Sequence, residues 1–404
     1  MTYEKMCSFE VLYSAYIEAR KRKRGKAATA QYEANALACT EKLSHILSTQ
    51  QYRPSKFETF YVYEPKKRLV QAPAFVDKVV LHAVTDNIIY KAITSSFIRD
   101  NYASQEGKGT HDGLMRLKQQ MVDYYRKTGT ADGWVLKCDV HHFFASIDHG
   151  LLKAKLQSLM ERKNIDWMVY QLLCTYIDTT PGLPLGYQTS QLFALMFLDE
   201  FDHIVKEKYR IKRYGRYMDD FFLIHPDKAE LQRLLKDIEA LMASYKLELN
   251  EKTAIFPLRN GIDFLGFHSY LTETGGVIQK LRQESIDRIR SRIKEWRRDY
   301  PEGKISKEKI KEKFTSWDAH AAHGDTHSLR EKYAKQVEEI IGEKVKIHRK
   351  INSTREVREK RRLKQYKHIM KKRELAGEPS PFSFSPQPTR ITPQGQQKGE
   401  TWQQ

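Results

Sequence analysis

The sequence is poor in the residues that build disulfide frameworks, zinc sites and membrane spans. Its 404 residues include only four widely separated cysteines, and none of them forms a Cys-x-x-Cys pair. This usage argues against a zinc ribbon or a disulfide scaffold and predicts a reducing, cytoplasmic environment. No apolar run is long enough to cross a membrane, and residues 1–8 are too polar for a secretory signal. We therefore expect no membrane partner.

Acidic residues are the second shortage. Only 51 Asp and Glu oppose 70 Lys and Arg, which leaves a formal net charge of +19. Such a balance predicts a polyanionic partner, and an affinity for it that falls steeply with salt. The length and the 40% hydrophobic content suit a globular protein with two or three subdomains.

Two adjacent carboxylates stand out against this basic background. Asp219 and Asp220 lie within 216–224, between aromatic and apolar residues that predict two short strands. Pairing of those strands would pinch 217–220 into a tight turn at the rim of a sheet, where both acids stay hydrated. An isolated Asp-Asp pair is common in solvated loops. Here the apolar flanks favour half of a metal site, because adjacent carboxylates repel until a divalent cation neutralises them.

A third acid completes the pattern. Asp139 ends the apolar run 134–138, which predicts a buried strand. Taken alone, Asp139 is explained equally well as a strand-end capping acid. Together with Asp219 and Asp220 it predicts a site for two Mg²⁺ ions roughly 3.5–4 Å apart, suited to in-line phosphoryl transfer. The Val140 carbonyl is a further candidate ligand.

Five segments in this order and spacing resemble the motifs of reverse transcriptases from bacterial retroelements. The segments are 139–149, 182–191, 217–220, 247–253 and 264–267. The resemblance covers roughly residues 10–340 and implies RNA-templated DNA synthesis from dNTPs. It also implies an α+β right-hand polymerase fold, with fingers, a ferredoxin-like palm built on a small antiparallel sheet, and a helical thumb.

The resemblance sets expected boundaries along the chain. We expect an N-terminal extension of two helices over 1–50, fingers over 51–131, and a palm over 132–270 with a fingers insert near 150–178. A helical thumb over 271–343 follows, where Ile289, Ile293 and Trp296 form an amphipathic stripe. Residues 344–375 predict a basic helix, and the Pro- and Gln-rich residues 376–404 predict disorder.

Nucleotide-binding roles follow from the resemblance. Lys67 and Arg68, on a short basic hairpin, match the family's contact to the incoming triphosphate; an exposed basic turn is the alternative. Phe144 matches the aromatic gate that excludes a 2′-hydroxyl, although it and Phe143 could both be core residues. Lys252 matches the lysine that assists pyrophosphate departure, and as a surface residue it could equally be inert.

Nucleic-acid contacts are expected at two glycine-containing segments. Lys108 lies between two glycines, where it could approach a nucleic-acid backbone closely. Phe264, Leu265 and Gly266 resemble the family's primer grip, where the glycine permits close approach of the primer strand.

The second motif departs from the commoner Pro-Gln-Gly. This chain has Leu185 before Gly186, and the motif ends in Gln191. The pattern resembles reverse transcriptases of diversity-generating retroelements, which copy a template RNA with frequent errors opposite adenine. An aliphatic side chain loses the polar contact that a glutamine supplies near the nucleotide. We therefore predict error-prone cDNA synthesis, on an RNA template and RNA/DNA duplex, with a small basic accessory protein as a candidate partner.

Two rival interpretations remain from the sequence. One is an antiphage-defence or stand-alone group II-like reverse transcriptase, and the other is an RNA-binding scaffold without catalysis. Histidine groups at 141–142 and 320–327 have no cysteines beside them, so a zinc site is not expected.

Overall fold

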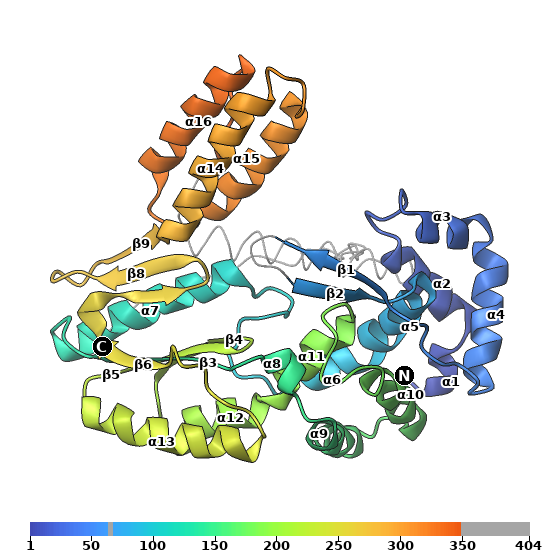
Figure 1. Ribbon diagram of the computed structural model, residues 1–404. Coiled ribbons are helices and arrows are strands. Elements are labelled where there is room, and N and C mark those ends of the chain that lie inside the picture. Colours follow the sequence, from blue (N-terminus) through green and yellow to red (C-terminus); the bar gives the residue numbers. More distant parts are fainter. Residues whose placement is uncertain (64–67, 349–404) are drawn as a thin grey trace, which may run out of the picture. The chain divides into compact units, whose positions relative to one another are not determined.

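A four-stranded antiparallel sheet is central to the computed structural model, which describes residues 1–63 and 68–348 (Figure 1). The strand order β4-β5-β3-β6 has the bounds Arg213–Tyr217, Asp220–His225, Trp134–Asp139 and Ala254–Pro257. β3 and β5 pair along their whole length, from Trp134 opposite His225 to Asp139 opposite Asp220. The end of β3 and the start of β5 therefore meet at one edge of the sheet.

Successive side chains along each strand point to opposite faces of this sheet, and both faces are covered by helices. The two covering helices are α7 (Thr110–Thr128) and α13 (Lys228–Ser244). Val135 and Phe222 join the core cluster on the α7 side, whereas Leu136 and Leu223 join the cluster that contains the buried leucines of α13. The apolar run before Asp139 is buried on both sides, as predicted, and this fixes the acid at the strand end.

A second antiparallel sheet has three strands and packs on α7. Its strands are β7 (Ile262–Phe264), β8 (Phe267–Leu271) and β9 (Val277–Leu281), and the 3-10 turn η3 (Leu258–Asn260) precedes them. β9 falls inside the range that was expected to be wholly helical. The expectation missed it because a five-residue strand gives a weak periodic signal.

The first 50 residues form four helices, not the two predicted. They are α1 (Tyr3–Met6), α2 (Phe9–Ala19), α3 (Ala27–Ala34) and α4 (Ala36–Ser48). The Ser8 side chain accepts a hydrogen bond from the backbone N of Val11 and so starts α2. Asn35, at φ −127° and ψ 36°, separates α3 from α4. The capping residue Ser8 and the non-helical residue Asn35 thus interrupt the two longer helices that the sequence predicted.

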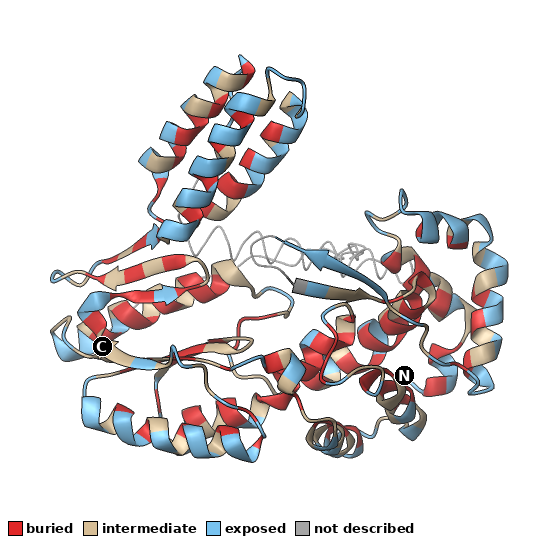
Figure 2. Cartoon of the chain, in the orientation of Figure 1, coloured by how far each residue is buried: buried red, intermediate tan, exposed pale blue. Residues whose placement is uncertain are grey.

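A two-stranded ribbon and a further set of helices follow. The ribbon is β1 (Glu58–Val62) with β2 (Arg68–Ala72), and every residue of β1 is exposed (Figure 2). A continuous helical stretch then comprises α5 (Phe75–Val84), the π turn η1 (Thr85–Ile89) and α6 (Tyr90–Thr94). The later helices are α8 (Phe143–Ser146), α9 (His149–Arg162), α10 (Trp167–Ile177), α11 (Gln188–Phe197), α12 (Asp199–His203) and the π turn η2 (Ile204–Lys208).

Three helices follow the second sheet and share a core cluster with Leu114 of α7 and with Phe267 and Leu281 of that sheet. They are α14 (Gln283–Asp299), α15 (Lys307–Ala321) and α16 (His327–Ile341). Ile289, Ile293 and Trp296, from the predicted stripe, are buried in that core. Figure 2 shows buried residues recurring along each of these helices between exposed ones. A buried ion pair between Asp318 and Arg330, at 2.7 Å, ties α15 to α16.

The predicted basic helix and the predicted disordered tail lie, from residue 349 onward, outside the described residues. Within residues 1–63 and 68–348, we find no helix whose length and apolar character would let it cross a membrane.

Candidate active site

The three predicted acids lie together at the edge where β3, β4 and β5 meet. Asp139 and Asp220 are opposite each other in the β3–β5 pairing, and Asp219 occupies the turn that joins β4 to β5. Met218 adopts a left-handed conformation, with φ 59°, which closes this two-residue turn. The Asp219 carbonyl accepts a hydrogen bond from the Val140 backbone N at 3.3 Å. The turn and the strand end are therefore locked to each other through the backbone.

A neighbouring segment braces the other side of Asp139. The Asp139 carbonyl accepts a hydrogen bond from the backbone N of Asn250 at 2.7 Å, and the backbone N of His141 donates to the Glu248 carbonyl at 2.8 Å. Lys252, which is exposed, follows two residues after Asn250 and donates its backbone N to that side chain at 3.0 Å. Asn250 therefore contacts both residues: its backbone N bonds the Asp139 carbonyl, and its side chain bonds the Lys252 backbone.

A buried arginine, Arg216, supports the turn that carries Asp219. Arg216 and Asp202 have no exposed surface, and the guanidinium donates to both Asp202 carboxylate oxygens, at 2.6 and 2.7 Å. Arg216 Nη1 also donates to the Met218 carbonyl at 2.8 Å. The ion pair therefore holds the residue that precedes Asp219. Sequence reasoning missed this support, since no spacing pattern links Asp202 to the turn.

A lysine also lies among the acids. The Lys137 ammonium contacts the Asp220 carboxylate as an ion pair without hydrogen-bond geometry. Burial lowers the pKa of Lys137 to about 8, against the raising effect of nearby carboxylates that include Asp139 and Asp219. Burial likewise raises the pKa of the adjacent Cys138 thiol to about 12, so this cysteine stays protonated and unreactive at neutral pH.

Phe144 is held by a glycine loop. Phe143 is buried, whereas Phe144 is half-buried, so only the first is a full core residue. The Phe144 carbonyl accepts a hydrogen bond from the Leu183 backbone N at 2.7 Å. A Cβ on Gly182, whose φ is +63°, would lie 2.5 Å from the same carbonyl oxygen. Only glycine fits this approach, and the approach fixes the backbone of Phe144 against the loop 182–187.

The same loop meets the ribbon. Leu185, in this loop, is 44% exposed. A Cβ on Gly186 would lie 1.8 Å from the Gln71 carbonyl oxygen, so β2 passes directly over this glycine. The Gln191 amide oxygen accepts a hydrogen bond from Ser104 Oγ at 2.5 Å.

The primer-grip-like residues form a tight turn between β7 and β8. Leu265 and Gly266 have φ values of 52° and 87°, and Phe264 pairs with Phe267 across the turn. The Phe264 ring is buried, with its centroid 5.1 Å from that of Phe222 in the central sheet. A Cβ on Gly266 would lie 3.0 Å from His320 Nε2, so α15 packs on this turn.

Comparison with known proteins identifies the family. Residues 64–269, just over half of the chain, match the family described as reverse transcriptase (RNA-dependent DNA polymerase). The chain belongs to the reverse transcriptase family. The predicted α+β right-hand polymerase fold is thereby confirmed.

Solved structures similar to this reverse transcriptase include two fungal telomerases. Telomerase from Candida albicans in complex with the TWJ fragment of telomeric RNA is 11% identical; the match covers 73% of this chain and 62% of that one, with a TM-score of 0.43. Apo telomerase from Candida tropicalis is 13% identical, with 75% and 66% coverage and a TM-score of 0.44. The reverse transcriptase thus spans less than two thirds of either chain. No curated protein matches it.

Lys108, Lys67 and Arg68 were also predicted to contact nucleic acid or nucleotide. The Lys108 ammonium donates to the carbonyls of Ile98 and Asn101, at 3.1 and 2.8 Å, and burial lowers its pKa to about 8. This internal role differs from the nucleic-acid contact that its glycine neighbours predicted. Lys67 lies outside the described residues, and Arg68 begins β2 with a side chain that is not described.

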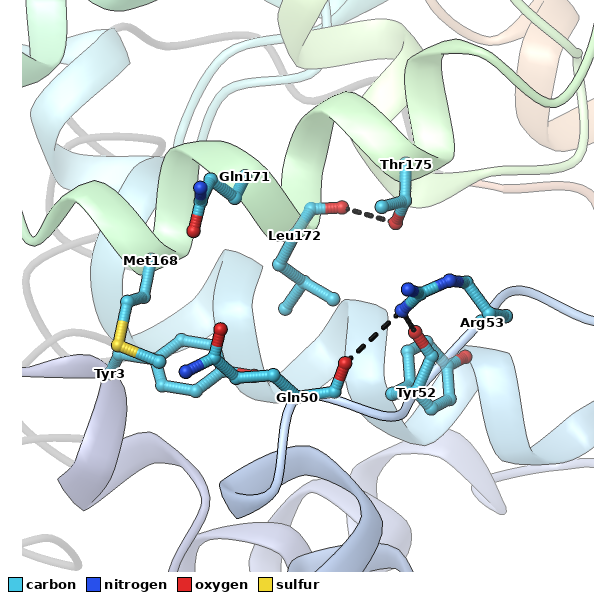
Figure 3. Close-up of a pocket in the computed structure, with 8 residues that line it drawn as sticks. All are labelled: Tyr3, Gln50, Tyr52, Arg53, Met168, Gln171, Leu172 and Thr175. Atoms are coloured by element: carbon cyan, nitrogen blue, oxygen red, sulfur yellow. Dashed lines mark hydrogen bonds between the residues drawn. The ribbon is translucent and has the colours of Figure 1, made fainter.

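Two other features of the reverse transcriptase contribute nothing to this site. The His111 and His323 rings lie 4.5 Å apart, yet no three His, Cys, Asp or Glu residues in the described part of the chain converge on a metal position. A surface pocket of about 300 Å³ opens between α1, residues 50–53 and α10 (Figure 3). Its lining, which includes Tyr3, Gln50, Arg53 and Met168, holds no carboxylate and shares no residue with the active site.

Proposed function

We propose that this reverse transcriptase makes cDNA by two-metal nucleotidyl transfer, with Asp139, Asp219 and Asp220 holding two Mg²⁺ ions. The observation that carries the proposal is the register that sets Asp139 against Asp220, with Asp219 in the adjoining turn. The donor set fits, because Mg²⁺ prefers oxygen ligands and all three side chains are carboxylates at one edge of the sheet. Bound Mg²⁺ would supply activation of the primer hydroxyl and charge neutralisation on pyrophosphate.

We assign nucleotide selection, pyrophosphate departure and primer contact to residues around the three acids. Phe144, held against the glycine loop, is positioned to exclude the 2′-hydroxyl of a ribonucleotide. Lys252 supplies positive charge near the leaving pyrophosphate. The Val140 carbonyl would be a further oxygen ligand, and the turn at Leu265 and Gly266 would contact the primer strand. Lys67 and Arg68 stay proposed contacts to the triphosphate of the dNTP.

Removal of the two turn acids tests the proposed site. The Asp219→Ala/Asp220→Ala variant is expected to lose at least about 10³-fold in extension rate on a primed RNA with Mg²⁺ and dNTPs, because phosphoryl transfer depends on charge neutralisation. Glu230→Gln removes an exposed acid paired with Arg233 and serves as the matched control. Equal extension by the Ala/Ala variant and the control would contradict the proposed metal ligands.

We further propose that this synthesis is error-prone and belongs to a diversity-generating retroelement, with an RNA template, an RNA/DNA duplex and a small basic accessory protein as partners. The support is the aliphatic residue in the second motif. Leu185 is exposed within the loop 182–187 that holds Phe144, and its side chain carries no amide. An incorrect base pair therefore forfeits no hydrogen bond at this position.

Restoring the amide is expected to raise fidelity. Leu185→Gln should lower misincorporation opposite template adenines by roughly 2- to 10-fold, the range that one positioned hydrogen bond supplies. Sequencing of cDNA made on a defined RNA template measures this rate, and Leu185→Met, which stays aliphatic, should keep the wild-type errors. Accurate or untemplated synthesis by the wild type would instead favour the defence or group II-like alternative.

A further inference from the structure

Lys137 places a positive charge directly against Asp220, one of the proposed metal ligands. It precedes Asp139 by two positions in β3, so the two side chains leave the strand on the same face. Only 18% of the Lys137 side chain is exposed. Its ammonium contacts the Asp220 carboxylate and lies 5.2 Å from the centroid of the Phe264 ring. A carboxylate and an aromatic face therefore both stabilise this buried cation.

Repulsion among the three carboxylates gives a buried lysine a physical role at this position. Three carboxylates at one sheet edge repel one another strongly when they are partly removed from water. A buried ammonium lowers the local charge from −3 to −2 and draws Asp220 toward itself.

We propose that Lys137 is an internal counter-ion of the catalytic acids: it positions Asp220 and weakens divalent-cation binding at the site. The inference rests on the proposed metal site. Lys137 acts in two opposed ways. Its charge repels an incoming cation, and its contact with Asp220 fixes the orientation that catalysis needs. A neutral side chain should therefore bind the cation more tightly and yet catalyse more slowly, a combination that loss of structure alone does not produce.

Mn²⁺ titration followed by electron paramagnetic resonance tests this, with the full chain and no nucleotide. Lys137→Met is expected to bind Mn²⁺ about tenfold more tightly than the wild type, since one repelling charge is gone. Its extension rate at saturating Mn²⁺ should fall. Lys137→Arg keeps the charge and should keep near wild-type affinity. Lys155→Met is the matched control, because Lys155 also pairs with a carboxylate (Glu200, 2.6 Å) and lies over a ring (Tyr245, 4.6 Å).

The outcomes separate this inference from the proposed function. Unchanged or weaker Mn²⁺ binding by folded Lys137→Met overturns the counter-ion role; if that variant does not fold, Lys137→Gln decides by the same criterion. Asp219→Asn/Asp220→Asn reports which Mn²⁺ signal belongs to the acids. If that variant binds Mn²⁺ like the wild type, the proposed metal site itself fails.

Discussion

Asparagine at position 202 is expected to destabilise this reverse transcriptase by about 3–5 kcal/mol, the usual result of leaving a buried charge without its partner. Asp202 and Arg216 are both fully buried, and the carboxylate accepts two hydrogen bonds from the guanidinium. Asparagine keeps the size of the side chain but leaves the cation unneutralised. Because Arg216 also donates to the Met218 carbonyl, the turn that carries Asp219 should lose its support as well.

Urea unfolding and primer extension measure the two consequences of Asp202→Asn. Glu230→Gln, which breaks the exposed pair with Arg233, is the control and should change the free energy of unfolding by less than about 1 kcal/mol. The variant at 202 should lose both stability and activity. A change in its free energy of unfolding as small as the control's would show that the buried pair does not support the turn.

The position of the three acids at one sheet edge was predictable, because each acid lies in a local sequence pattern. The apolar run before Asp139 and the apolar flanks of Asp219 and Asp220 mark buried strands, and a two-residue turn between paired strands sets the register. Burial of the Ile289–Trp296 stripe was likewise predictable from helical spacing. In both cases the signal lies within a single element, so no knowledge of tertiary contacts was needed.

Partners that come from distant parts of the chain were not predictable in this way. Asp202 lies 14 residues before Arg216 and in a different element, and no sequence spacing predicts that the two residues pair. Lys108 is a second example: its glycine neighbours predicted a close approach to a nucleic-acid backbone but gave no sign that its half-buried ammonium donates to the carbonyls of Ile98 and Asn101. Tertiary contacts decide what a charged side chain does, and a single sequence does not display them.

Alanine at position 186 is expected to reduce kcat/KM for dNTP incorporation by on the order of 100-fold, the loss that a displacement of about 1 Å near the chemistry can cause. The added Cβ would lie 1.8 Å from the Gln71 carbonyl oxygen, so either the loop 182–187 or strand β2 must move. That loop also contacts the Phe144 backbone through Leu183, and its displacement should therefore disturb the proposed nucleotide gate.

Stability should distinguish Gly186→Ala from Asp202→Asn. The β1–β2 ribbon is a two-stranded sheet in which every residue of β1 is exposed, so shifting it sacrifices little buried surface. We expect Gly186→Ala to unfold in urea near the wild-type midpoint while losing activity. Gly25→Ala is the control, because no described atom lies within 4 Å of its added Cβ. Wild-type incorporation by Gly186→Ala would mean that the ribbon moves aside without affecting the site, and that the contact between β2 and the second motif does not position the nucleotide.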